Sequence, residues 1–110
     1  MNWIALQSET QLFEITERSS DRPQVIFKHS TRCSTSALVK GRLERAAQSD
    51  EIDFYYLDLL SHRPISNMIA DTFRIRHESP QVLLIRDGQC IYDESHMAIT
   101  MDCIVDATAA

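Results

Sequence analysis

Apolar residues recur along this chain with two different periods, and the alternation of the two predicts its elements. Residues three or four apart form apolar faces that are typical of helices. Short continuous apolar runs are instead typical of buried strands. The runs lie at Trp3–Leu6, Gln24–Lys28, Ile52–Leu57, Val82–Ile85 and Gln89–Tyr92. The order strand-helix-strand-helix-strand-helix-strand-strand-helix predicts helices on both faces of one sheet.

Local signals place the helix starts. Ser8 followed by Gln11 is a capping-box pattern, and the helix that it opens is expected to reach about Arg18. A second helix is expected from Thr35 to about Ala47. A third begins at His62-Arg63-Pro64, because proline suits the first helical position. A final helix is marked by Met97, Met101, Ile104, Val105 and Thr108.

The last two strands are expected to form a hairpin. Asp87-Gly88 stands between two apolar runs, which is a strong hairpin signal. A hairpin at this point makes the sheet mixed rather than all parallel. No linker, repeat or low-complexity stretch interrupts the pattern. We therefore predict a single α/β domain over residues 1–110.

Composition narrows the class of protein. Of the 110 residues, 44% are hydrophobic and 25% charged, as in ordinary globular domains that need neither disulfides nor metal. A net charge of −5 without a Lys/Arg run argues against nucleic-acid binding. The N-terminal segment has neither the basic region nor the long apolar core of a signal peptide or membrane span, so the cytoplasm is the expected compartment. Three widely spaced cysteines predict free thiols.

The most informative residue is Cys33. It lies where the loop after the strand Gln24–Lys28 becomes the first turn of a helix. Main-chain N–H groups point outward at such a turn, and the helix dipole favours an anion there. The thiolate is the form of cysteine that attacks disulfides. Arg32 and His29 add positive charge nearby, so the sequence indicates a reactive thiol.

A family resemblance covers about Trp3 to Ile99. The stretch Phe27–Cys33 resembles the active-site stretch of the monothiol bacilliredoxins, a family associated with the small thiol bacillithiol. Four further segments resemble the same family in the same order, namely Tyr55–Asp58, His62–Asn67, Arg76–Ile85 and Ser95-His96. The resemblance implies a thioredoxin-like three-layer α/β/α fold with a mixed central sheet.

The resemblance also implies an activity and a site. Family members reduce mixed disulfides between protein cysteines and bacillithiol, and their attacking residue corresponds to Cys33. Pro80 resembles the cis-proline beside the active cysteine, where it exposes the main chain of Ser79 to an extended thiol or peptide. Gln81 follows it in the expected substrate-binding set. Lys28 resembles by position a lysine that binds thiol carboxylates in glutaredoxins.

Two serines follow the cysteine. Ser34 stands where the family usually has proline, and it leaves a main-chain N–H free to contact the sulfur. Ser36 stands where a two-cysteine motif would have its second thiol. A serine hydroxyl can hydrogen-bond a thiolate, but it cannot resolve a mixed disulfide by exchange. A one-thiol cycle is therefore expected, in which the small thiol moves onto Cys33 and a second thiol releases it.

The other polar and sulfur-bearing residues have open roles. His29 either tunes Cys33, binds a carboxylate of the small thiol, or makes an ordinary loop hydrogen bond. Lys28 and Arg32 either bind the small thiol or are ordinary solvated charges. For the two remaining cysteines we expect packing roles, at Cys90 and Cys103.

The expected partners are bacillithiolated proteins and a low-molecular-weight thiol such as bacillithiol, with no nucleic acid and no membrane. The four histidines lack the spacing of a metal site and no Cys-x-x-Cys occurs, so neither metal nor cofactor is expected. Two alternatives stay open. One is a non-catalytic module that docks peptides near Pro80. The other is an iron–sulfur carrier, although Ser34 and Thr35 replace the Gly-Phe of that motif.

Overall fold

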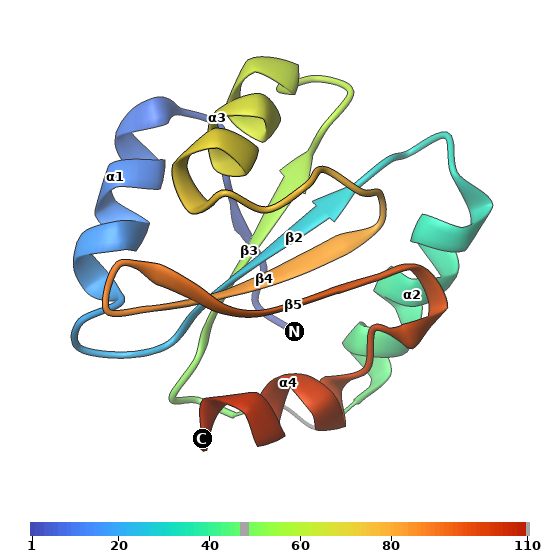
Figure 1. The fold of residues 1–110 in the computed structure, drawn as a ribbon. Coiled ribbons are helices and arrows are strands. Elements are labelled where there is room, and N and C mark those ends of the chain that lie inside the picture. The colour runs from blue at the N-terminus through green and yellow to red at the C-terminus, as the bar shows by residue number, and fades with distance from the viewer. Residues whose placement is uncertain (47–48, 110) are drawn as a thin grey trace.

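The computed structural model describes residues 1–46 and 49–109. In this part of the chain, five strands form one sheet in the order β1-β3-β2-β4-β5 (Figure 1). β1, β3 and β2 run parallel, whereas β4 and β5 are antiparallel to their neighbours. The strands are β1 (Ile4–Ala5), β2 (Gln24–His29), β3 (Asp53–Asp58), β4 (Gln81–Arg86) and β5 (Gln89–Ser95). The mixed sheet is thus confirmed.

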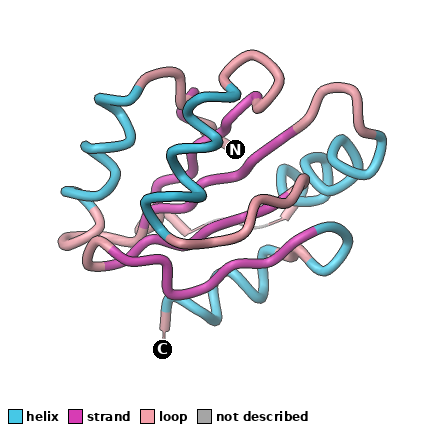
Figure 2. The backbone as a smooth tube through the Cα atoms, turned by 45° about the horizontal axis from the view of Figure 1, so that its top comes forward, coloured by secondary structure: helices cyan, strands magenta, loops and turns pink. Residues whose placement is uncertain are grey.

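Helices cover both faces of the sheet, so the molecule has three layers (Figures 1 and 2). α1 and α3 pack a first apolar cluster against one face, and α2 and α4 pack a second against the other. The helices are α1 (Glu9–Arg18), α2 (Ser34–Arg45), α3 (Arg63–Phe73) and α4 (Met101–Thr108). The predicted order of elements is confirmed. Ala47, which we expected at the end of the second helix, lies outside the described residues.

β2 is the centre of the fold. All six of its residues are buried, because β3 and β4 flank it and helices cover both faces. Three consecutive apolar residues, Val25, Ile26 and Phe27, supply both clusters, as expected for a strand buried on both sides. The strand ends in two buried polar residues, Lys28 and His29. Both lie at the sheet end that leads into the loop carrying Cys33.

Two predicted local signals are present. The Ser8 hydroxyl accepts the Gln11 N–H at 3.2 Å, and the Gln11 carboxamide oxygen accepts the Ser8 N–H at 3.1 Å, which completes the capping box of α1. In the hairpin between β4 and β5, Asp87 and Gly88 have φ angles of 51° and 75°. These left-handed conformations are those that a two-residue hairpin turn requires.

The predicted start of the final helix is wrong. Met97 lies in a separate 3₁₀ turn, His96–Ala98, and the chain is extended at Ile99 and Thr100. Ile99 is fully buried, so the chain turns inward before the helix begins. The Thr100 hydroxyl then accepts the Cys103 N–H at 3.2 Å and caps α4. Apolar spacing across this segment is therefore a property of the core and not of one continuous helix.

Candidate functional site

Cys33 occupies the N-cap of α2. Its backbone is extended (φ −108°, ψ 119°), and its carbonyl accepts the Ala37 N–H at 3.1 Å. The N-cap is the position at which a side-chain oxygen usually accepts a first-turn N–H, but no side chain does so here. The sulfur is half-buried, whereas Arg32 and Ser34 beside it are exposed. The arrangement offers helix N–H groups and a positive dipole end to an anionic sulfur.

Ser36 is fully buried, and its hydroxyl is already engaged. It accepts the Ser30 N–H at 3.1 Å and lies 2.6 Å from Nδ1 of His29. Burial is the main cause that lowers the pKa of His29, and Lys40 adds to it, against Asp58 and Glu44. A hydrogen bond therefore joins the Ser36 hydroxyl to Nδ1 of a neutral ring. Ser36 therefore ties the end of β2 to the first turn of α2.

The His29 ring packs against two aromatic residues. Its centroid lies 5.9 Å from that of Phe27 and 5.4 Å from that of Tyr56. Such packing fixes the ring plane, so the bond to Ser36 has a fixed direction. Of the roles left open for His29, the structure displays an ordinary hydrogen bond, which spans the loop to reach Ser36 in α2. A role in tuning Cys33 or binding a carboxylate stays a prediction.

The loop that enters β4 contains the expected cis-proline. The peptide bond Ser79–Pro80 is cis, which confirms the prediction made from the resemblance. Pro80 is buried, and its carbonyl accepts the His96 N–H at 3.0 Å. Gln81 is 1% exposed, pairs in register with Lys28, and donates its carboxamide N–H to the Arg76 carbonyl at 2.9 Å. Gln81 thus holds this loop from beneath.

Lys28 is not the solvated charge that we considered. Its side chain is 0% exposed. Its ammonium donates to the Ser66 carbonyl and to Nδ1 of His77, both at 3.2 Å. Burial lowers its pKa from 10.5 to about 8. A carboxylate-binding role would have to act through the residues that cover it, and that role stays a prediction.

Sequence reasoning missed two contacts at this site, Ser36–His29 and Lys28–His77. In each, the partners are brought together by packing of separate elements. For His77, its position three residues before Pro80 is the signal in the sequence that could have singled it out.

Basic side chains gather at the end of the sheet that carries the thiol. Arg32, Arg63 and Arg76 are exposed on the three segments that leave β2, open α3 and enter β4. These segments share one end of the sheet because β2 and β3 are parallel and β4 is antiparallel to β2. Three arginines thus lie at the end of the sheet that carries Cys33, where Asp58 ends β3 and Glu78 lies in the loop before β4.

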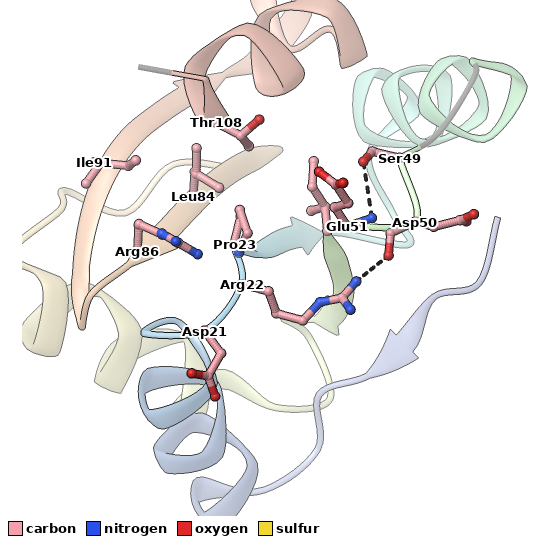
Figure 3. A pocket seen from close by; sticks show the side chains of 11 residues that line it. Asp21, Arg22, Pro23, Ser49, Asp50, Glu51, Leu84, Arg86, Ile91 and Thr108 are labelled. Atoms are coloured by element: carbon pink, nitrogen blue, oxygen red, sulfur yellow. Dashed lines mark hydrogen bonds between the residues drawn. The ribbon is translucent and has the colours of Figure 1, made fainter.

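The other end of the sheet has a pocket without a thiol. It measures about 510 Å³ and is lined by Pro23 before β2, Glu51 before β3 and Arg86 at the end of β4, all at the end of the sheet opposite Cys33 (Figure 3). Arg22 there donates to the Asp50 carbonyl. Within residues 1–46 and 49–109, no group of three His, Cys, Asp or Glu side chains could hold a metal. None of the helices described is long and apolar enough to span a membrane.

Sheet order, a cysteine at the N-cap of the helix after the central strand, and a cis-proline before the antiparallel strand define a protein of the thioredoxin fold. Three solved structures show the likeness. A candidate oxidoreductase with a thioredoxin fold matches with a TM-score of 0.83 and 27% identity over 94% of this chain and 91% of its own. Malassezia sympodialis thioredoxin (Mala s 13) gives 0.74 and 21% over 98% and 90%, and spinach chloroplast thioredoxin f gives 0.71 and 11% over 96% and 88%.

The family described as monothiol bacilliredoxin BrxC matches residues 4–104, and the chain belongs to this family. The fold and the family expected from the sequence are therefore confirmed. Membership in this family, together with the fold, supports a thiol oxidoreductase function.

We expect Cys33 to be alkylated first among the three cysteines and Cys90 last. Burial raises the pKa of the Cys90 thiol to about 11, and its S–H donates to the Tyr92 carbonyl at 3.3 Å. Cys103 is exposed on α4, a helix that is capped by the Thr100 hydroxyl and not by a thiol. Brief iodoacetamide treatment near neutral pH, followed by peptide mass spectrometry, measures the order. Labelling of Cys90 as fast as Cys33 would contradict it.

Proposed function

We propose that this protein is a one-thiol oxidoreductase that removes bacillithiol, or a similar low-molecular-weight thiol, from the cysteines of other proteins. The observation that carries the proposal is the first turn of α2. Cys33 lies at its N-cap, and the place of a second thiol is taken by a buried serine hydroxyl already bonded to His29 and Ser30. A site so built can attack a disulfide but cannot resolve the product internally.

The reaction has two exchange steps. In the first, the Cys33 thiolate attacks the sulfur of the small thiol in the mixed disulfide. The bond between the small thiol and the target protein breaks, a bond from Cys33 to the small thiol forms, and the target cysteine leaves as a thiolate that takes up a proton. In the second, another molecule of the small thiol attacks the adduct, which regenerates Cys33 and releases the small-thiol disulfide.

Two features of the site support binding of such a substrate. Among the described residues, none forms a hydrogen bond with the main chain of Ser79, which precedes the cis-proline. That main chain is available to pair with an extended segment, as a short added strand would. Arg32 and Ser34 flank Cys33 on its exposed side, where a thiol substrate has access. We include Lys28, His29, Ser36, Pro80 and Gln81 in the site as residues that shape it.

Intact-mass measurement after exposure to bacillithiol disulfide tests the proposal. The wild type should gain one bacillithiol on Cys33. The variant Ser36→Cys should instead reach an internal disulfide with Cys33, because two thiols in one helical turn have a high effective concentration.

Ser36→Ala is the matched control. It loses the same hydroxyl but provides no thiol, so it should keep the adduct. A disulfide from Cys33 to Cys90 or Cys103 in the wild type would show a two-thiol protein and overturn the one-thiol cycle.

A further inference from the structure

The buried contact between Lys28 and His77 joins the central strand to the cis-proline loop. Lys28 ends β2 and is enclosed by α3 and by the loop that follows α3. An ammonium group has hydrogen-bond donors and no acceptor. Nδ1 of His77, 3.2 Å from the Lys28 ammonium, must therefore be the acceptor. The Ser66 hydroxyl lies at 3.4 Å from the same nitrogen.

This contact fixes the tautomer of His77. Since Nδ1 accepts, the proton of the neutral ring lies on Nε2, the nitrogen at the other edge of the ring. Burial is the main cause that lowers the pKa of His77, and the positive charges of Lys28 and Arg63 add to it, against Glu78. The ring is therefore neutral near physiological pH. His77 is an exposed residue, so its Nε2–H is available as a donor outside the protein core.

The charges around His77 favour an anionic acceptor. Lys28 lies beneath it, and Arg63 at the start of α3 is close enough to affect its titration. The acidic group that faces it, Glu78, is 3.3 Å from Nε2 of His96. The balance of charge at this loop is thus positive, and a carboxylate is an acceptor that suits an N–H donor in such a place.

We propose that His77 is a specificity-determining residue that donates its Nε2–H to a carboxylate of the small thiol in the mixed disulfide. Lys28 is its positioning residue, because it holds the ring in the tautomer that leaves Nε2–H free. The inference rests on the proposed function and names a feature of its substrate. The ligand class is a carboxylate-bearing thiol, recognised at the loop that precedes Pro80.

Two adducts of one model protein test the role of His77. One carries 3-mercaptopropionate and the other 2-mercaptoethanol, which differ in the carboxylate. The wild type should release the first with the higher kcat/KM. His77→Phe removes the donor and keeps the ring size, and it should lower kcat/KM for the carboxylate adduct roughly tenfold, as expected for one charge-assisted hydrogen bond. Release of the 2-mercaptoethanol adduct should change less than about twofold.

The tautomer of His77 provides a second measurement, which does not depend on activity. Nitrogen-15 NMR of the histidine rings should show His77 of the wild type as the Nε2–H form alone. Lys28→Met removes the donor to Nδ1 and should give a mixture of both tautomers. Lys40→Met, which removes the other lysine of the chain, should leave the His77 signal unchanged.

The outcomes distinguish failure of the His77 assignment from failure of the proposed oxidoreductase function. A His77 ring protonated on Nδ1 in the wild type, or an equal loss for both adducts in His77→Phe, would overturn the inference and leave the oxidoreductase intact. Failure of the wild type to release the 3-mercaptopropionate adduct would overturn the inference, and failure to release bacillithiol from the same model protein as well would overturn both. A loss confined to the carboxylate adduct, together with the Nε2–H form, establishes the assignment.

Discussion

Replacing Cys33 with serine is expected to abolish release of bacillithiol from a bacillithiolated model protein. A hydroxyl stays protonated at neutral pH and cannot attack a disulfide, so no adduct forms. The fold should persist, because serine is among the best N-cap residues and Cys33 makes no side-chain cap bond of its own. Mass spectrometry of the model protein measures the release, and thermal unfolding of the variant checks that it is folded.

The other two cysteines provide the controls for this experiment. Cys90 is half-buried in edge strand β5 and Cys103 is exposed on α4, whereas Cys33 opens α2 (Figure 1). Cys90→Ala and Cys103→Ser should therefore keep most of the activity. Activity in Cys33→Ser, or its loss in Cys103→Ser, would show that the attacking thiol has been misassigned.

Substituting Lys28 with methionine is expected to change how stability depends on pH. The pKa of Lys28 is lowered to about 8 in the folded protein against 10.5 for an ordinary lysine. Below pH 8 both states carry the proton, so the folded state bears the full cost of a buried charge. Between about pH 8 and 10.5 the unfolded state binds more protons, and wild-type stability rises with pH.

The difference in unfolding free energy between Lys28→Met and wild type should therefore fall across that range. The expected fall is on the order of 3 kcal/mol, since one pKa unit corresponds to about 1.4 kcal/mol. Urea unfolding of both proteins at pH 7.5 and 10.5 measures this fall. Groups that titrate in both proteins contribute equally to the two unfolding free energies, so their contribution drops out of the difference. Lys40→Met, at a partly buried position on α2, controls for loss of any lysine. If the difference in unfolding free energy between Lys28→Met and wild type is the same at both pH values, folding does not bury the Lys28 charge.

Much of the fold could be predicted because the strongest signals are local. The apolar run in β2, the capping box at Ser8 and the Asp87-Gly88 turn each depend on a few neighbouring residues. The start of α4 could not be predicted in the same way. Burial of Ile99 interrupts the helical spacing, and that burial depends on α2 and the sheet, which a local pattern does not contain.

The site was predictable where chemistry follows from position in the chain. The place of Cys33 at a helix start followed from the strand, loop and helix signals around it, and the cis bond at Pro80 followed from the resemblance. The contacts of Lys28 were not predictable. A lysine at a strand end usually extends to water, and here α3 and its following loop cover it instead. Whether a polar side chain is buried is decided by distant segments.

The two edge strands of the sheet, β1 and β5, affect how readily this protein aggregates at high concentration or during refolding. β1 has only two residues, so one margin of the sheet offers little unpaired backbone. β5 forms the other margin, where the pairing with β4 shifts register at Leu84 and Ile85, and where Asp93 and Glu94 bring negative charge. Short, irregular and charged margins discourage another chain from adding a strand. The same molecule should thus resist aggregation even when concentrated or recovering from partial unfolding.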